Sequence, residues 1–186
     1  MLPTFSDNRT PATLRVDLLL IGLLVALGVA ARLAPHALNV SPIMASALFA
    51  GFVLQRRALS PAVPIAALLI SDLALGFYDW RVALVVYAAM TLPTLVGVLA
   101  RRQRLAYVVL PAVLSGSLIF FVTTNFAVWA FSGLYSHDWP GLVQCYIAAL
   151  PFLKSTVAGD LFWSALLFGG AWLIQVMNAR STAEAR

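Results

Sequence analysis

Charged residues are scarce in this sequence. Asp, Glu, Lys and Arg make up 10% of its 186 residues and hydrophobic residues make up 62%, whereas soluble domains carry about 25% charged and about 45–50% apolar residues. So few charges cannot cover a water-exposed surface, which excludes a soluble globular domain. Because a helix needs about 20 residues to cross the hydrocarbon core, the chain has room for about five to seven spans. We therefore expect an all-α integral membrane protein.

The side chains on which many catalytic and metal sites depend are also nearly absent. Cys145 is the only cysteine, so no intrachain disulfide can form. The only glutamate, Glu184, lies in the C-terminal tail, which excludes zinc chemistry of the HExxH type. Neither histidine has the spacing of a metal motif, and no GxSxG sequence is present. We predict no catalytic residue, no metal site, no resident cofactor and no enzymatic activity.

One remote enzymatic alternative rests on two aspartates. The sequences at 78–79 and 158–160 resemble the YD and GxGD motifs of presenilin-like intramembrane aspartyl proteases. Ala158 replaces the first glycine of the second motif, and Asp79 falls at an expected helix end rather than inside a span. The resemblance to a protease therefore stays a remote alternative.

Six apolar stretches follow one another along the chain, separated by charged residues or by Pro and Gly. They lie at about 16–34, 42–55, 61–78, 82–100, 105–132 and 142–178. The second is short, and we expect the segment before it to dip into the protein as a loop. The last is long for one span, so we divide it at Pro151 into a segment at about 142–153 and a helix at about 155–178. We predict a single six-helix membrane domain at 15–178, between tails at 1–14 and 179–186 that look disordered.

The basic residues gather on one side of this predicted topology. With six spans, both termini and the second and fourth loops share a side of the membrane. Nine of the 12 Lys and Arg residues lie there, namely Arg9, Arg15, Arg56, Arg57, Arg101, Arg102, Arg104, Arg180 and Arg186. Under the positive-inside rule that side faces the cytoplasm. We predict cytoplasmic termini in the bacterial inner membrane and no binding to nucleic acid.

Polar and aromatic residues gather in the loops that then face outward. Asn39 and Ser41 lie in the first loop, and Tyr78 lies in the third. Trp80 and Trp139 lie beside outward loops, where a role in the interfacial aromatic belt is an equal alternative. We take Asn39, Ser41 and Tyr78 as candidate ligand-binding residues.

Asp72 is an ionisable residue inside the third span. A charge at that depth costs about 2.5 kcal/mol or more, so it normally faces a partner or a cavity. We interpret Asp72 as a ligand or ion contact, and a buried pair with Arg32 or Lys154 is the alternative. Asp160 and Lys154 lie near the start of the last helix, six residues apart, so we expect each to pair with another helix. An architectural salt bridge and a functional role are equal alternatives for them.

Three further features suggest binding. Asn125 and Trp129 lie four residues apart, on one helical face, and form a plausible rim for a planar ligand; an interhelical role for Asn125 is the alternative. Cys145 is a candidate ligand for a metal-containing solute such as a corrinoid, and a role as a small, buried packing residue is the alternative. In the first span, Gly22, Ala26 and Ala30 form a ladder of small residues for docking a partner subunit or for internal packing.

Several strings of the sequence carry a family resemblance. They are Asn39-Val40-Ser41-Pro42, Ala47-Leu48-Phe49-Ala50-Gly51, Ser71-Asp72-Leu73 with Gly76, Thr124-Asn125-Phe126 with Trp129, Gly141-Leu142 with Cys145-Tyr146, Ala149-Leu150-Pro151-Phe152, and Gly159-Asp160-Leu161. Over about 39–170, the chain resembles a bacterial family of unknown function whose members are described as transport proteins. That family is similar to the substrate-binding S components of energy-coupling factor (ECF) vitamin transporters, which are small six-helix membrane proteins.

The resemblance implies a function and a set of binding residues. It implies capture of a vitamin-like solute from the outer side, with transport coupled to a transmembrane subunit and ATPases or carried out by the chain alone. The shared positions fall on Asn39, Ser41, Asp72, Asn125, Trp129, Cys145 and Tyr146. Cobalamin is a candidate solute because one solitary S component binds its cobalt through a cysteine, although that cysteine lies in a third loop, which here has none. A membrane assembly or structural protein is the alternative class.

Overall fold

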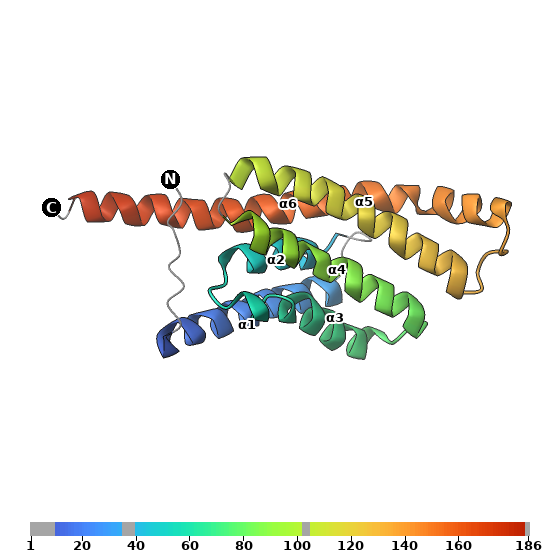
Figure 1. The fold of residues 1–186 in the computed structure, drawn as a ribbon, viewed down its shortest axis with the longest axis horizontal. Coiled ribbons are helices and arrows are strands. Elements are labelled where there is room, and N and C mark those ends of the chain that lie inside the picture. The colour runs from blue at the N-terminus through green and yellow to red at the C-terminus, as the bar shows by residue number, and fades with distance from the viewer. Residues whose placement is uncertain (1–9, 35–39, 102–104, 185–186) are drawn as a thin grey trace.

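The computed structural model describes residues 10–34, 40–101 and 105–184, which form six α-helices and no β-strand (Figure 1). The helices are α1 (Pro11–Leu33), α2 (Ile43–Val53), α3 (Ala62–Leu75), α4 (Trp80–Ala100), α5 (Leu105–Phe131) and α6 (Trp139–Glu184), with a 3₁₀ turn, η1 (Arg57–Leu59), before α3. Five segments, with η1 and α3 taken together, are long and apolar enough to cross a membrane. The all-helical class is confirmed, and the chain has the character of a multi-pass membrane protein.

The helices run along the long axis of the molecule and form three pairs that are layered across it (Figure 1). α1 packs against α3, α2 against α4, and α5 against α6, with the α2/α4 pair in the middle. Successive helices run in opposite directions, so α1 begins at the same end of the bundle where α6 ends (Figure 1). This end also holds Arg15, Arg56, Arg57, Arg101 and Arg180, and we call it the arginine-rich end.

Helix α2 lies at the centre of the bundle. Ten of its 11 residues are buried, and it contacts α4, α6, α3 and α1. Its sequence is apolar on every side, which is typical of a helix surrounded by protein. At about 1.5 Å per residue it measures about 16 Å, roughly half of a 30 Å hydrocarbon core. The short second stretch is therefore an internal helix that is too short to be a full span by itself.

The segment before α2 packs inside the protein. Val40 lies against Gly159 of α6, and Pro42 is fully buried. The expected loop also includes residues 35–39, which lie outside the described residues.

Helix α6 is continuous over 46 residues, so the predicted division at Pro151 is wrong. A proline removes one backbone donor, and membrane helices tolerate it because neighbouring groups satisfy the freed carbonyl. Pro93 and Pro111 likewise lie inside α4 and α5. At about 1.5 Å per residue α6 is about 69 Å long, more than twice the thickness of the hydrocarbon core. It extends past the other helices at the arginine-rich end (Figure 1), and its last residues make part of the predicted C-terminal tail helical.

A buried carboxylate, which the sequence patterns missed, ties α1 to the turn after α2. Asp17 of α1 is 1% exposed. Its two carboxylate oxygens accept hydrogen bonds from the backbone N–H groups of Gln55 and Arg56, at 3.0 and 2.8 Å. Hydrogen bonds to an ionised acceptor are stronger than neutral ones. Asp17 therefore holds the first helix against the turn that leads to α3.

Replacing Asp17 with alanine is expected to destabilise the protein by about 1–3 kcal/mol, because two partly buried backbone donors lose their acceptor. The stability of Asp17→Asn should lie between those of the wild-type protein and the alanine variant, since an amide offers only one acceptor oxygen. Val16→Ala is the control: this side chain is 55% exposed, and its loss should change stability by no more than about 0.5 kcal/mol. Chemical unfolding in detergent measures the three variants, and equal stabilities would contradict a role for Asp17.

Candidate functional site

Two adjoining cavities lie between the helices in the half of the bundle away from the arginine-rich end. The larger has a volume of about 380 Å³ and the smaller about 180 Å³, and Val86, Phe120 and Thr156 line both. The larger cavity is lined by Arg32, Ser41, Ile43, Leu68, Leu75, Tyr78, Val86, Met90, Phe120, Thr156 and Asp160. These residues come from the end of α1, the start of α2, the second half of α3, the first half of α4, the facing parts of α5 and α6, and the connections before α2 and after α3.

An ion pair forms one wall of the larger cavity. Arg32 Nη2 lies 2.9 Å from Asp72 Oδ1, and the Tyr87 hydroxyl donates to Asp72 Oδ2 at 2.9 Å. The Asp72 side chain is 2% exposed and that of Arg32 is 21% exposed, so the carboxylate is buried behind the guanidinium. Of the interpretations left open for Asp72, the structure shows the pair with Arg32. Arg32, rather than Asp72, lines the cavity.

The opposite wall of the larger cavity holds a second buried carboxylate. Asp160 of α6 is 3% exposed, and its Oδ2 accepts a hydrogen bond from the Ser117 hydroxyl at 2.8 Å. Thr156 lines the same cavity one helical turn earlier, which places both polar groups on one face of α6. Lys154 is exposed and forms no ion pair with another described residue. As expected, Asp160 bonds to another helix, α5, but its partner there is the hydroxyl group of Ser117.

Tyr78 and Ser41 reach the larger cavity from the two connections at this end. Gly76 ends α3 with φ at 97°, a conformation that glycine adopts readily, and the chain then turns toward Tyr78. Burial raises the pKa of the Tyr78 phenol, and Asp72 raises it further. The phenol is therefore neutral near pH 7 and offers both a donor and an acceptor to the cavity.

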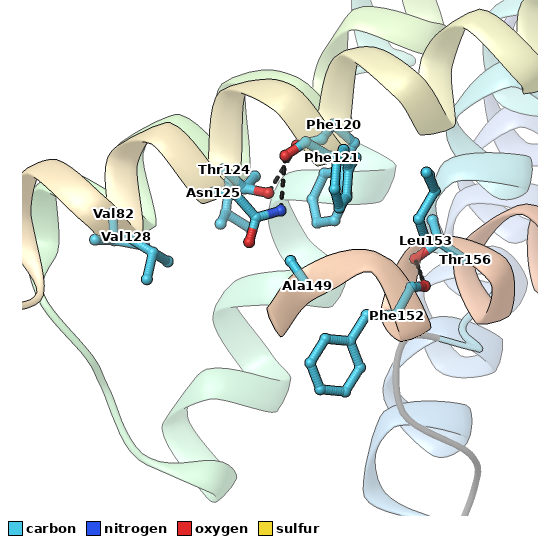
Figure 2. A pocket seen from close by; sticks show the side chains of 11 residues that line it. Val82, Phe120, Phe121, Thr124, Asn125, Val128, Ala149, Phe152, Leu153 and Thr156 are labelled. Atoms are coloured by element: carbon cyan, nitrogen blue, oxygen red, sulfur yellow. Dashed lines mark hydrogen bonds between the residues drawn. The ribbon is translucent and has the colours of Figure 1, made fainter. Parts of the chain in front are cut away.

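The smaller cavity is mostly apolar, and its polar groups are largely bound to their own helices (Figure 2). The Asn125 amide donates to the Phe121 carbonyl at 2.7 Å, and the Thr124 hydroxyl donates to the Phe120 carbonyl at 2.7 Å. No described residue bonds the amide oxygen of Asn125 or its second N–H, so both can contact a solute. Asn125 is thus a lining residue, as predicted, although one of its donors is already used.

Trp129, Cys145 and Tyr146 join α5 to the chain that follows it. The Trp129 indole donates to the Ser136 carbonyl at 2.9 Å, Cys145 Sγ donates to the Asn125 carbonyl at 3.4 Å, and the Tyr146 hydroxyl donates to the Val122 carbonyl at 2.7 Å. Cys145 is fully buried, and none of the three lines either cavity. Their polar atoms hold the α5–α6 hairpin together.

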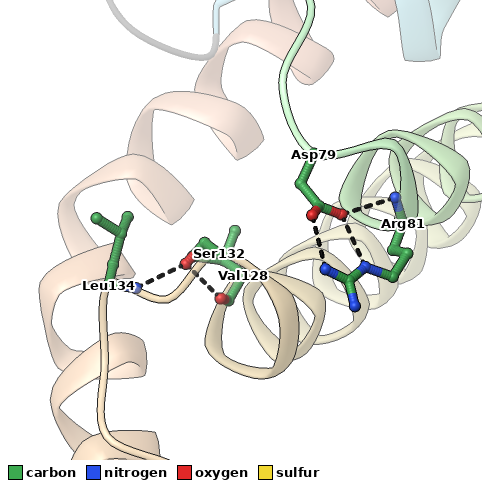
Figure 3. Close-up of polar contacts among 5 residues, drawn as sticks. All are labelled: Asp79, Arg81, Val128, Ser132 and Leu134. Atoms are coloured by element: carbon green, nitrogen blue, oxygen red, sulfur yellow. Dashed lines mark hydrogen bonds and ion pairs between the residues drawn. The ribbon is translucent and has the colours of Figure 1, made fainter.

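A surface ion pair marks the start of α4 beside the end of α5 (Figure 3). The Asp79 carboxylate accepts hydrogen bonds from the backbone N–H and the side chain of Arg81, and the guanidinium of Arg81 lies 4.9 Å from the centre of the Phe131 ring. The hydrogen bonds from Arg81 lower the pKa of Asp79 to about 2. Asp79 lies outside both cavities whereas Asp160 lines the larger one, so the two aspartates of the protease alternative do not share a site.

The structure sorts the eight predicted ligand-binding residues into groups. Ser41, Tyr78 and Asn125 line a cavity, and Asp72 lies behind Arg32. Asn39 lies outside the described residues. The polar lining residues that were missing from the predicted binding set are Arg32, Thr124, Thr156 and Asp160. The sequence could have identified Asp160 as a lining residue, because it is an ionisable residue in a span. Thr156 could then have been found from its position one helical turn earlier on the same face.

The predicted docking face on α1 is open. Gly22, Ala26 and Ala30 are all exposed, and a side chain at Gly22 would meet no atom within 4 Å. The close approach of α1 to α3 occurs instead at Gly28, where an added Cβ would lie 3.0 Å from Ala67 Cβ. The small residues of this ladder are therefore not used for packing among the described helices.

The comparisons with known proteins give a family. No curated protein and no solved structure matches the chain. A family of unknown function, DUF6580, matches it over residues 12–182, which covers all six helices almost completely. The chain therefore belongs to the DUF6580 family of unknown function.

Proposed function

We propose that this chain is the solute-binding membrane subunit of an uptake system for a compact, vitamin-like nutrient. The observation that carries the proposal is the larger cavity, about 380 Å³ in volume, with Arg32, Tyr78 and Asp160 in its wall. Ligand sites are typically cavities of about 300–1,000 Å³ with apolar walls and a few placed polar groups. A purely architectural membrane protein has no need to keep such groups around an open volume.

The position of the cavities supports uptake from outside. If the arginine-rich end faces the cytoplasm, as the positive-inside rule suggests, both cavities lie in the outer half of the bundle. Both chain ends then lie on the cytoplasmic side, and α1, α3, α4, α5 and α6 cross the bilayer with α2 enclosed between them. The family resemblance to ECF S components supports the same orientation and a bacterial inner-membrane location.

The same proposal assigns the exposed face of α1 to a partner. Gly22, Ala26 and Ala30 would let a second helix approach the backbone closely. We propose that this partner is an ECF-type transmembrane subunit, which acts with ATPases. Transport by the chain alone is the alternative mode of the same binding function.

The cavity favours compact solutes over cobalamin. A corrinoid is far larger than the molecules that fit a cavity near the lower end of the usual range. Cys145, the proposed thiol ligand for cobalt, is buried and donates to the Asn125 carbonyl. The structure gives no support to a Cys145–cobalt contact, although cobalamin belongs in any screen of solutes.

The proposal is tested by thermal unfolding of the purified protein with a panel of vitamins, their precursors and cobalamin. A solute that binds only the folded state stabilises it by about 2.7 kcal/mol at a concentration of 100 times its Kd, so we expect at least one clear rise in the unfolding midpoint. Val86→Phe fills the volume where the cavities adjoin and should abolish that rise. Leu84→Phe, on the same helix at a position that is 64% exposed, should preserve it. A panel without any stabilising solute would contradict the proposal.

A further inference from the structure

The two charged residues in the wall of the larger cavity stand on opposite sides of the bundle. Arg32 lies near the end of α1, in the α1/α3 pair, and Asp160 lies in the middle of α6, in the α5/α6 pair. The cavity extends between them, since both residues line it. A molecule in the cavity can therefore reach a cationic group on one side and a carboxylate on the other.

The guanidinium of Arg32 has unused donors. One nitrogen, Nη2, pairs with Asp72, whereas Nη1 is buried and has no hydrogen-bond partner within the part of the chain that the structure describes. The Tyr87 hydroxyl donates to the other carboxylate oxygen of Asp72. Leaving a buried donor without an acceptor destabilises the protein. A small rotation of the guanidinium would turn Nη1 toward the cavity, where a carboxylate or another anionic group on the solute would supply the missing acceptor and fit the planar fork.

Asp160 has unused acceptors. Among the described residues it accepts one hydrogen bond, from Ser117, and the Ser117 hydroxyl also lies 2.9 Å from the Val113 carbonyl. One hydroxyl hydrogen cannot fully serve both oxygens. An ionised carboxylate can accept about four hydrogen bonds, and burying one without donors is costly. A cationic or N–H group is what this buried oxygen pair lacks.

We propose that the captured solute is amphoteric, with an anionic group bound by Arg32 and an ammonium or other N–H group bound by Asp160. This inference rests on the proposed function. The rest of the wall is mainly apolar, with hydroxyl groups from Ser41, Tyr78 and Thr156. Its apolar residues are Ile43, Leu68, Leu75, Val86, Met90 and Phe120. The solute therefore has a small apolar body between its two polar ends.

The test uses a series of probes that differ only in charge. The α,ω-amino acids from 3-aminopropanoate to 8-aminooctanoate are compared with the monocarboxylates and the monoamines of the same chain lengths, by thermal unfolding of the whole protein. Molecules that copurify with the gently extracted protein are identified by mass spectrometry. We expect the copurifying solute, or the best-fitting amino acid, to bind at least tenfold more tightly than either singly charged analogue.

The variants remove each charge from the cavity wall without leaving another buried charge unpaired. Asp160→Asn keeps an acceptor for Ser117, and the double variant Arg32→Gln/Asp72→Asn removes both members of the buried pair together. Each should weaken binding of the amphoteric solute at least tenfold. The matched control is Arg81→Gln/Asp79→Asn, which removes an ion pair outside the cavities and should leave binding unchanged.

The outcomes separate this inference from the proposed function. If a solute stabilises the wild-type protein and both cavity variants equally, the amphoteric assignment is wrong while solute capture stands. If Na⁺ or K⁺ alone stabilises the wild-type protein but not Asp160→Asn, Asp160 is a cation site and the assignment is likewise wrong. If nothing copurifies and no compound of either panel stabilises the protein, the proposed function fails, and the amphoteric assignment fails with it.

Discussion

Gly97→Ala is expected to destabilise the folded protein by about 1–3 kcal/mol or more, the usual range for overpacking a dense core. Gly97 of α4 faces α2, and a Cβ added there would collide with the Leu48 carbonyl oxygen and the Phe52 nitrogen. These are backbone atoms, which cannot rotate away as a flexible side chain can. The central helix would have to move away from α4, and most of its ten buried residues would lose contacts.

Gly51→Ala tests the same close contact between α2 and α4 from the other helix. Gly51 lies on α2 at the same crossing, and a Cβ there would collide with the backbone of Thr94 in α4. Small residues on both helices allow the two backbones to meet closely. Gly51→Ala should therefore be as damaging as Gly97→Ala, and the two together should not be additive, because the first already separates the helices.

The controls are glycines inside helices that face open space. A Cβ added at Gly22 of α1 or Gly170 of α6 would meet nothing within 4 Å. Alanine is also the better helix former, by about 1 kcal/mol per residue, so Gly22→Ala and Gly170→Ala should be neutral or slightly stabilising. Reversible unfolding in detergent, followed by circular dichroism, measures all four variants. Equal stabilities across the set would show that α2 and α4 are not packed backbone to backbone.

Much of the helical framework was predictable from apolar stretches and their breaks. The starts and ends of α4 and α5 fall within about two residues of the predicted ranges, because charges and turn residues mark both ends. The position of α2 inside the bundle was harder to predict, because a short stretch has the same apolar sequence whether lipid or protein surrounds it. The continuity of α6 was missed because we expected Pro151 to break the helix. An internal proline breaks helices of soluble proteins far more often than membrane helices.

The candidate site was predicted in part for a similar reason. Sequence reasoning finds polar residues that are costly in a membrane, and Ser41, Tyr78 and Asn125 do line the cavities. It cannot tell which polar groups bind one another. The bonds of Trp129 and Tyr146 to backbone carbonyls depend on how the α5–α6 hairpin folds back, which no spacing along the chain reveals.

Arg32→Gln is expected to cost about 3–5 kcal/mol, because it leaves the carboxylate of Asp72 buried without its counter-charge. Asp72 is 2% exposed and would keep only the hydroxyl of Tyr87, 2.9 Å from Oδ2. Arg32→Lys should be milder, since the ammonium group retains the charge while losing the planar fork. The free energy of unfolding of each variant gives the measurement.

Removing both charges should restore most of that loss. In Arg32→Gln/Asp72→Asn no buried charge is left unpaired, and replacing a buried ion pair by neutral groups is often close to neutral in stability. The double-mutant cycle should therefore show strong coupling between positions 32 and 72. The comparison pair is Asp79 and Arg81, with side chains 27% and 46% exposed, where an ion pair is worth about 0–1 kcal/mol. If Arg32→Gln proved no more damaging than Arg81→Gln, Asp72 would have to reach water or another cation, and the wall of the larger cavity would differ from the one described.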